Sequence, residues 1–286
     1  MKVETEVDRG GLVSELEAKA LNIRRDIIKM TGMAGSGHPG GSLSAADIVA
    51  AIYFHALRHD PKNPKWKERD RFILSKGHAA PVQYAALAEA GYIERNLLWT
   101  LRKFRSPLQG HPDMRKVAGV EVSTGSLGQG LAIACGMALA GRLDGADYTV
   151  YTLMGDGECQ EGEVWEAAMM AAHYGLGNLI AITDCNELQI DGRLSDIKDI
   201  RPVPDKWRAF GWDVRCVDGH DMEEIVAALD EAKAIKDRPV MIEAKTVKGK
   251  GVSFMENRVE WHGVAPNKEQ MATALMELGI DDWTAW

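Results

Sequence analysis

Two short polar motifs carry the residue types that hold a divalent metal ion together with a diphosphate. The first motif, GDG, is residues 155–157, and the second, DCN, is residues 184–186. Asp156 offers a hard anionic oxygen and Asn186 a neutral amide oxygen. Both suit a small cation such as Mg²⁺, which completes its shell with phosphate oxygens and water. The two glycines let the backbone approach phosphate groups closely. These residue types therefore predict a metal–diphosphate site.

Each motif follows an apolar run that is typical of a buried strand. The run 148–154 leads into Asp156, the run 178–184 leads into Asn186, and thirty positions (186 − 156) separate the two candidate ligands. A helix is expected between the runs, so the strands should be parallel, with both ends at one edge of a sheet. The alternative, a tight Gly-Asp-Gly turn and an unrelated asparagine, is less consistent with this context.

The composition is typical of a globular protein and argues against several classes. The 286 residues suffice for one large domain or two small ones, with 45% hydrophobic and 27% charged residues. A net charge of −8 argues against general nucleic-acid binding, and no apolar run approaches the ~18 residues of a membrane span. The polar N-terminus lacks the apolar core of a signal peptide. No CxxC pair or zinc spacing occurs among Cys135, Cys159, Cys185 and Cys216, which favours a reduced, cytoplasmic protein.

The alternation of strands and helices predicts a single α/β domain over 1–286, with a largely parallel sheet flanked by helices. Ser14 and Glu17 fit a capping box for the first long helix, so residues 1–13 are expected as a short extension. Ser44 and Asp47 are expected to cap a second helix. From about 248 to 286 we expect a C-terminal tail with one short amphipathic helix. The expected strands are 71–75, 148–154, 178–184, 212–217 and 240–246, and the expected helices are 80–90, 96–104, 131–143, 164–174, 207–210 and 222–236.

Four of the eight histidines lie beside a glycine in loop-like sequence. They are His38, His78, His111 and His262. A histidine in this context faces a cleft more readily than a core, although each one alone is more often a loop residue. Imidazoles bind phosphate and hydroxyl groups and move protons near neutral pH. The shared context therefore predicts that the four converge on one polar pocket. His220, also after a glycine, is expected only to start a helix.

Seven motifs occur in the order found in transketolases and span residues 38–266. They are GSGHPGGSLSAADI, DRFILSKGHAAP, GHPD, STGSLGQGL, MGDGECQEGEVWEA, DCNELQIDG and WHGVAP. The chain therefore resembles the N-terminal, diphosphate-binding part of the transketolase family, and a thiamine diphosphate-binding fold is implied. Two positions depart from the family pattern. Cys185 replaces the first asparagine of the thiamine diphosphate fingerprint, and Ser126 replaces a common proline.

The resemblance implies a cofactor, a metal and roles for particular residues. The cofactor is thiamine diphosphate with Mg²⁺, or Ca²⁺ or Mn²⁺ in its place. The implied metal ligands are Asp156, Asn186 and the carbonyl of Leu188. The implied cofactor-binding residues are His78, Gly125, Leu127, Asp156, Gly157, Asn186 and His262, and the implied catalytic residues are His38, His78, His111, His262 and Glu161. Glu161 matches a carboxylate that, with Glu166, links paired active sites. A solvated helix N-terminus is the alternative interpretation of both.

The resemblance also implies transfer of a two-carbon ketol unit from a ketose phosphate to an aldose phosphate, as in the pentose phosphate pathway. Nothing after Pro266 resembles the family's later parts. We therefore expect a separate N-terminal subunit that works with a C-terminal transketolase subunit in a hetero-oligomer of paired dimers; a truncated piece is the alternative. No nucleic-acid or membrane partner is expected. An alpha-type subunit of a 2-oxo-acid dehydrogenase-like thiamine enzyme stays open but suits the histidines less. A nucleotide-binding protein is disfavoured because GxxxxGK[ST] is missing.

Overall fold

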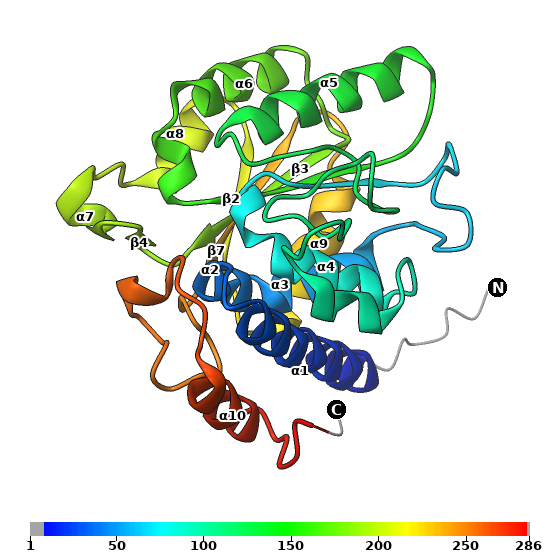
Figure 1. Ribbon diagram of the computed structural model, residues 1–286. Helices are drawn as coiled ribbons and strands as arrows, with labels where there is room; N and C mark the ends of the chain where they lie inside the picture. The colour runs from blue at the N-terminus through cyan, green and yellow to red at the C-terminus, as the bar shows by residue number, and fades with distance from the viewer. Residues whose placement is uncertain (1–8, 285–286) are drawn as a thin grey trace.

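A five-stranded parallel sheet forms the centre of the computed structural model, which describes residues 9–284 (Figure 1). The strand order is β1-β2-β3-β7-β6, and every neighbouring pair runs parallel. The predicted strands agree with these five to within a few residues, so the largely parallel sheet is confirmed. The strands are β1 Arg71–Leu74, β2 Val150–Gly155, β3 Leu179–Cys185, β6 Asp213–Asp218 and β7 Val240–Lys245, and a small hairpin adds β4 Leu188–Gln189 and β5 Gly192–Arg193.

Helices cover both faces of the sheet. Figure 1 shows α5, α6 and α8 on one face and α1, α3, α4 and α9 on the other, with α10 outside α1. This is the layered α/β arrangement expected from the sequence. The helices are α1 Arg9–Ala34, α2 Pro39–Ser44, α3 Ala46–Ala51, α4 Ala80–Glu89, α5 Gln129–Leu143, α6 Gly162–His173, α7 Leu194–Ile197, α8 Val203–Ala209, α9 Met222–Ala234 and α10 Lys268–Glu277.

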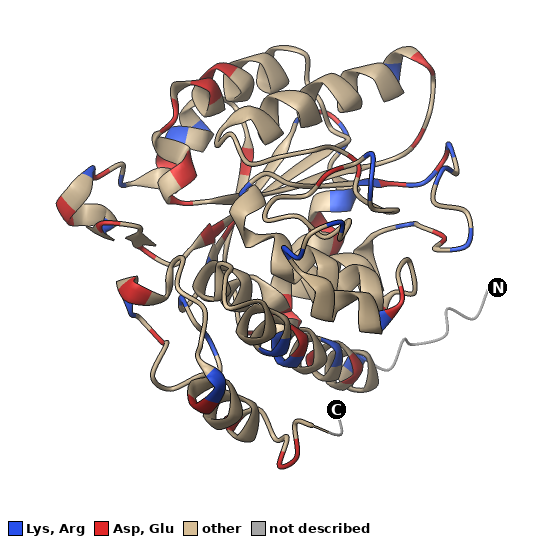
Figure 2. Cartoon of the chain, viewed as in Figure 1, with Lys and Arg blue, Asp and Glu red and all other residues tan. Residues whose placement is uncertain are grey.

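The sheet separates two hydrophobic clusters because successive strand residues point to opposite faces. In β2, Tyr151 and Leu153 pack toward α1, α3 and α4, whereas Val150 and Met154 pack toward α5 and α6. Both faces are therefore buried, as parallel sheets require. Figure 2 shows the strands mostly free of charged residues, which gather on the outer helices and loops. Within residues 9–284, no helix combines the length and apolar character needed to cross a bilayer.

Three predictions of helix boundaries were wrong. The first helix begins by Arg9 rather than at the predicted capping box of Ser14, because Leu12 and Val13 already pack against the core and extend the helix. Residues 1–8 of the expected extension lie outside the described residues. The helix expected after Ser44 is present as α3 from Ala46, but no side chain caps it. A separate short helix, α2, begins before it at Pro39, whose fixed φ suits a first helical turn. The helix expected over 96–104 is only a 3₁₀ segment, Arg95–Thr100.

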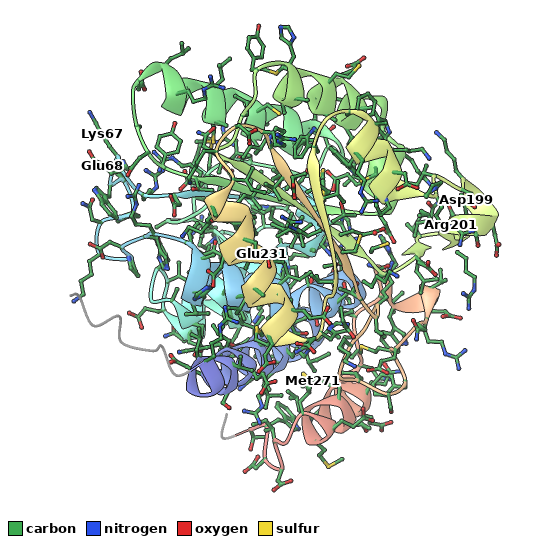
Figure 3. The ribbon with its side chains drawn as sticks, turned by 180° about the vertical axis from the view of Figure 1, so that it is seen from behind. Lys67, Glu68, Asp199, Arg201, Glu231 and Met271 are labelled. Carbon is green, nitrogen blue, oxygen red and sulfur yellow. The ribbon has the colours of Figure 1, made fainter. Side chains whose placement is uncertain are left out.

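The C-terminal segment packs against the domain. The predicted amphipathic helix is present as α10, and Asn267 and Gln270 cap it through a reciprocal capping box. Met271 of α10, labelled in Figure 3, lies so close to α1 that a Cβ added at Gly32 would sit 2.5 Å from its sulfur. Leu275 is fully buried in the same cluster. The segment expected as a tail therefore contributes to the core around α1.

Two glycines of α5 provide a matched test of how closely this helix packs against the end of β1. A Cβ at Gly130 would lie 2.2 Å from Ser75 Oγ, whereas a Cβ at Gly136 would meet nothing within 4 Å. Gly130→Ala should therefore lower the free energy of unfolding by about 1–3 kcal/mol through overpacking. Gly136→Ala should raise it by about 0.5–1 kcal/mol because alanine is the better helix former. Urea unfolding of both variants checks this, and equal effects would contradict the close α5–β1 contact.

Candidate active site

The strand register brings the two polar motifs together at the carboxyl edge of the sheet. Gly155, at the end of β2, is paired with Asp184 of β3, and Cys185 is paired with Lys245 of β7. Asp156 and Asn186 therefore leave neighbouring strands at the same height. Both side chains line one cavity of about 350 Å³. The predicted meeting of the motifs at one sheet edge is confirmed.

Nine of the eleven residues predicted for the site line this cavity. They are His78, Gly125, Leu127, Asp156, Gly157, Glu161, Asn186, Leu188 and His262. The other two, His38 and His111, lie beside it. Eight further residues complete the lining, and of these only Gly155, in the GDG motif, had been singled out: Gly41, Lys76, Gly155, Glu158, Gln160, Gln189, Ile190 and Lys248.

Asp156 is a buried carboxylate of the cavity, with only 2% of its surface exposed. Its Oδ1 accepts a hydrogen bond from the Gly157 N–H at 2.7 Å, and its Oδ2 accepts one from the Glu187 N–H at 2.5 Å. Burial, and next the charge of Asp184, raises the pKa of Asp156 to about 6. Both causes would be offset by a bound cation, because a positive charge favours the ionised carboxylate.

The oxygen donors beside Asp156 suit a hard metal ion. Asn186 Oδ1 accepts from the Leu188 N–H at 3.2 Å and retains a second lone pair, as does the Leu188 carbonyl. One carboxylate, one amide and one carbonyl match the preference of Mg²⁺ or Ca²⁺ for oxygen ligands. Within residues 9–284, no three histidine, cysteine or acidic side chains form a metal cluster. A metal here would therefore depend on this mixed oxygen set and on oxygens of a ligand.

Three of the four predicted histidines form one group. The ring centroids of His78 and His262 are 5.2 Å apart, and His38 lies 5.4 Å from His78 and 5.6 Å from His262. His111 joins from another loop by packing on Gly125, where an added Cβ would lie 2.6 Å from the imidazole. Gly125 has φ 141°, so it serves both the turn and this close approach. The histidines therefore gather at one place, although only His78 and His262 line the cavity itself.

His220 lies outside the group, and it does not start the helix that follows it. Its Nδ1 is 2.7 Å from Asp47 Oδ2, and its Nε2 accepts from the Val247 N–H at 2.8 Å. Asp47 in turn pairs with Arg24, so this buried chain of contacts links α1 and α3 to the segment after β7. Asp221, the next residue, caps α9 instead.

Burial keeps the grouped histidines neutral. It lowers the pKa of His78 to about 2, of His262 to about 3 and of His38 to about 4. The second cause is a nearby cation in each case: Lys76 for His78, Lys248 for His262 and Arg102 for His38. At neutral pH these rings can therefore each donate one hydrogen bond and accept another, but they add no positive charge.

Two buried lysines supply the positive charge of the cavity, and the sequence analysis missed both. Each has 2% of its surface exposed. Lys248 Nζ donates to the Leu188 carbonyl at 2.9 Å and lies 2.8 Å from His262 Nδ1. Burial, and next the charge of Lys76, lowers the pKa of Lys248 to about 8. Because the Lys248 ammonium donates a hydrogen bond to Nδ1 of His262, the proton of this ring lies on Nε2.

Lys76 is held by Asp184, which is fully buried at the end of β3. The Lys76 ammonium pairs with Asp184 Oδ2 and donates to the Gly41 carbonyl at 2.7 Å. The Ser44 hydroxyl, once expected to cap a helix, donates to the same carboxylate at 2.6 Å, and Thr246 donates to its other oxygen. Burial alone would raise the pKa of Asp184, but Lys76 overcomes this and lowers it. Asp184 thus fixes an ammonium group at the cavity wall.

Glu158 connects the loops that surround the cavity. Its Oε1 accepts from the Gly128 N–H at 2.9 Å and from the Ser75 hydroxyl, and its Oε2 accepts from the Gly155 N–H at 3.1 Å. The residue is 2% exposed, and burial raises its pKa. By contrast, Glu161 is exposed at the mouth and makes no capping hydrogen bond to α6. Glu166 is exposed on α6 and does not line the cavity.

The cavity is chemically suited to a metal-bound diphosphate. Two ammonium groups and three hard oxygen donors line it, so a diphosphate and its metal would each find opposite charge. The buried Oε1 of Gln189, on the same wall, has no hydrogen-bond partner among the described residues. At Gly41, a Cβ would sit 3.8 Å from both His78 Nε2 and Lys76 Nζ, so its absence leaves room between these donors. These observations fit the cofactor implied by the sequence.

A family profile described as "Transketolase, thiamine diphosphate binding domain" matches residues 17–285. The chain belongs to this family. The similarity covers nearly all of the described residues, including every cavity residue named above. The resemblance drawn from the seven sequence motifs is therefore confirmed.

Two similar proteins are themselves subunits of about the same length. The chain is 47% identical to the 6-deoxy-6-sulfo-D-fructose transketolase subunit SqwG of a Clostridium species, over 92% of this chain and 96% of the relative. It is 42% identical to a subunit of the apulose-4-phosphate transketolase of Phocaeicola vulgatus, over 93% of this chain and 94% of the relative.

Other relatives are longer, and the chain matches only part of them. It is 46% identical to human transketolase over 92% of its own length but spans 41% of that protein. The crystal structure of transketolase from Campylobacter jejuni superimposes with a TM-score of 0.89 at 36% identity, covering 94% of this chain and 43% of that one. The fold is therefore that of one part of a transketolase.

The low pKa values of the grouped histidines can be tested by varying the pH. In NMR spectra, the rings of His38, His78 and His262 should stay neutral from pH 8 down to pH 5, because their pKa values lie at about 4 or below. The unfolded chain takes up these protons near pH 6.5. The free energy of unfolding should therefore fall as pH drops below 6.5, and less so in His78→Gln. Ring titration near pH 6.5 would contradict the burial of these groups.

Proposed function

We propose that this chain is the N-terminal subunit of a thiamine diphosphate-dependent transketolase, active together with a C-terminal subunit. The observation that carries the proposal is the single cavity lined by Asp156, Asn186, two buried lysines, His78 and His262, with His38 and His111 beside it. Relatives of equal length that are named transketolase subunits support the division into two chains. The 2-oxo-acid dehydrogenase alternative is not favoured, because the family match and the similar proteins described above are transketolases.

The residues of this chain would bind the cofactor through its diphosphate. Asp156, Asn186 and the Leu188 carbonyl would hold Mg²⁺, or Ca²⁺ or Mn²⁺, while Lys76 and Lys248 would neutralise the phosphate oxygens. Gly125, Leu127 and Gly157 would let the backbone approach the cofactor. When bound, thiamine diphosphate supplies a nucleophilic carbon and an electron sink for the two-carbon unit.

The neutral histidines would handle the hydroxyl groups of the sugar. His262, with its proton on Nε2, can donate a hydrogen bond from that atom toward the cavity. His38 has Arg102 beside its Nδ1 at 3.4 Å, which favours the same tautomer. A neutral imidazole can also accept a proton from a hydroxyl as a carbon–carbon bond breaks. We assign His111, at the rim beside Gly125, to the C1 hydroxyl, and His38 and His78 to proton transfer near the reacting carbons.

The partner and substrates follow by analogy with the relatives. A C-terminal transketolase subunit would bind the pyrimidine ring of the cofactor, in a hetero-oligomer of paired dimers whose sites Glu161 and Glu166 connect. A ketose phosphate and an aldose phosphate, as in pentose phosphate metabolism, are the proposed donor and acceptor, since relatives are named for sugars with phosphate or sulfonate groups. The four free cysteines are consistent with a cytoplasmic site of action.

Asp156→Ala tests the metal and cofactor assignment. Without this carboxylate the metal loses its only anionic protein ligand, so metal-dependent thiamine diphosphate affinity should fall by more than about 100-fold. His111→Ala serves as a matched control, since this ring lies at the rim and should leave cofactor affinity within about twofold. Calorimetry in Mg²⁺, with circular dichroism to verify folding, measures both. Near-normal cofactor binding by Asp156→Ala would overturn the assignment.

Mixing experiments test the two-chain enzyme. This chain alone should transfer no ketol unit, because its residues surround only the diphosphate half of the cofactor. Adding the C-terminal subunit should restore turnover of a ketose phosphate with an aldose acceptor and raise the melting temperature, since a partner that binds only the folded form stabilises it. Turnover by this chain alone at the rate of the mixture would exclude the split enzyme.

A further inference from the structure

A second cavity, of about 560 Å³, lies beside the cofactor cavity at the carboxyl edge of the sheet. The ends of β3 and β7 form its inner wall. Residues of the segment 193–204 form its outer wall, on which Arg201 is labelled in Figure 3. Among the described residues, only Asn186 lines both cavities. The volume of this second cavity is that of a small-molecule site.

Glu243 of β7 is a buried carboxylate in the wall of the second cavity, with 8% of its surface exposed. Within residues 9–284, its hydrogen-bond partners are two thiols: Cys185 Sγ lies 3.7 Å from Oε1, and Cys216 Sγ lies 3.5 Å from Oε2. Thiols are weak donors. No lysine, arginine or histidine in the described part of the chain forms an ion pair with this carboxylate.

The other buried acids of the described chain have stronger donors. Each of them accepts hydrogen bonds from backbone N–H groups, hydroxyls or cationic side chains. These six are Asp26, Asp47, Asp70, Asp156, Glu158 and Asp184. Burying a carboxylate is costly unless such donors replace its water. A cationic donor that enters the second cavity would supply to Glu243 what the fold provides to the other six.

Two exposed cations without an ion pair also line the second cavity. Lys245 follows Glu243 on the same face of β7, about 6.6 Å further along the strand, and Arg193 lies on the outer wall. No carboxylate of residues 9–284 lies within 4.0 Å of either cation, whereas Arg201 on the same wall pairs with Asp199 at 2.8 Å. Positive charge is therefore available close to the buried carboxylate.

The rest of the lining suits an apolar group. Two positions of the lining, Glu187 with φ 59° and Asn257 with φ 56°, have the left-handed backbone that gathers at ligand-binding sites. An apolar surface with a few placed polar groups is typical of a small-molecule site. The apolar residues of the outer wall are Leu194, Pro202, Val203 and Pro204.

We propose that the second cavity binds a small zwitterion with an apolar body, of which an α-amino acid with an apolar side chain is the simplest example. Its ammonium group would donate to Glu243, its carboxylate would accept from Lys245 and Arg193, and its side chain would pack on the outer wall. A simple amine would leave both cations unpaired, and a simple anion would be repelled by Glu243. One molecule that carries both charges is therefore favoured. The inference does not depend on the proposed function.

Calorimetry on the full chain with four probes tests the three contacts separately. L-Phenylalanine should show saturable binding at concentrations up to about 10 mM. N-acetyl-L-phenylalanine lacks the ammonium group, phenethylamine lacks the carboxylate, and glycine lacks the apolar body. Each of these three should bind at least about tenfold more weakly, because each loses a charge-assisted hydrogen bond or the apolar contact.

Three variants locate the binding. Glu243→Gln keeps the size of the side chain but removes its charge, so it should weaken L-phenylalanine binding about tenfold or more. Lys245→Gln, at an exposed position, should weaken it by up to about fivefold. Glu231→Gln is the matched control and should leave the affinity unchanged. Glu231, labelled in Figure 3, pairs with Arg215 and lies on α9, which covers the opposite face of the sheet from α8.

Several results overturn the proposal. They are no saturable binding of L-phenylalanine, equal affinity for all four probes, unchanged affinity in both Glu243→Gln and Lys245→Gln, and an equal loss in Glu231→Gln. Binding that thiamine diphosphate with Mg²⁺ displaces and that does not depend on Glu243 would assign the amino acid to the cofactor cavity. If circular dichroism shows that Glu243→Gln is unfolded, Lys245→Gln and the four probes decide.

The competing occupant of the second cavity is a basic side chain of the C-terminal subunit. In that case Glu243→Gln should weaken association of the two subunits, and adding the wild-type C-terminal subunit should abolish binding of L-phenylalanine. Both results together, measured by calorimetry, would assign the cavity to the partner and overturn the small-molecule site. Binding of L-phenylalanine that persists in the two-chain complex supports it.

Discussion

The buried ion pair between Lys76 and Asp184 holds together the edge of the sheet on which the site is built. Asp184 ends β3 with no exposed surface, and two hydroxyls from distant segments share its oxygens with the ammonium. Removing two charges from water is costly unless both are paired and hydrogen-bonded, and here both are. One carboxylate thereby joins the segment after β1, the segment before α3 and the segment after β7, which all border the cavity.

This pair also sets the charge balance around Asp156. Burial raises the pKa of Asp156 and lowers the pKa of Lys248, and the charges of Asp184 and Lys76, respectively, add to these shifts. Like charges of each sign thus repel one another in a buried environment, where water screens them weakly. Under the proposed function, a divalent metal and a diphosphate would relieve both strains at once. The shifted pKa values of Asp156 and Lys248 are then consequences of charges that are positioned before the ligand binds.

The sequence was sufficient to predict the parts of the site that depend on short motifs and on the order of strands and helices. Asp156 and Asn186 could be placed together because parallel strands end at one edge, and the glycine-flanked histidines could be grouped by their context. The buried residues Lys76, Asp184 and Glu158 could not, since most of their partners lie 30 to 140 positions away along the chain. From sequence alone, lysine, aspartate and glutamate are normally expected to be exposed to solvent. The start of α1 was missed for a related reason, because core packing of Leu12 and Val13 outweighed a local capping signal.

The sheet closes one side of the cavity, and the other side is open to solvent. At the open side, Ile190 lines the cavity with 63% of its surface exposed, and Val264, two residues after His262, is 58% exposed. Under the proposed function, the C-terminal subunit would cover this open side. Chemistry on a carbanion also requires exclusion of water, and hydrogen bonds from neutral histidines gain strength in a dry site. The buried floor and the exposed rim thus differ: the floor is suited to bind charge, and the rim, with Ile190 and Glu161, is where a partner would exclude solvent.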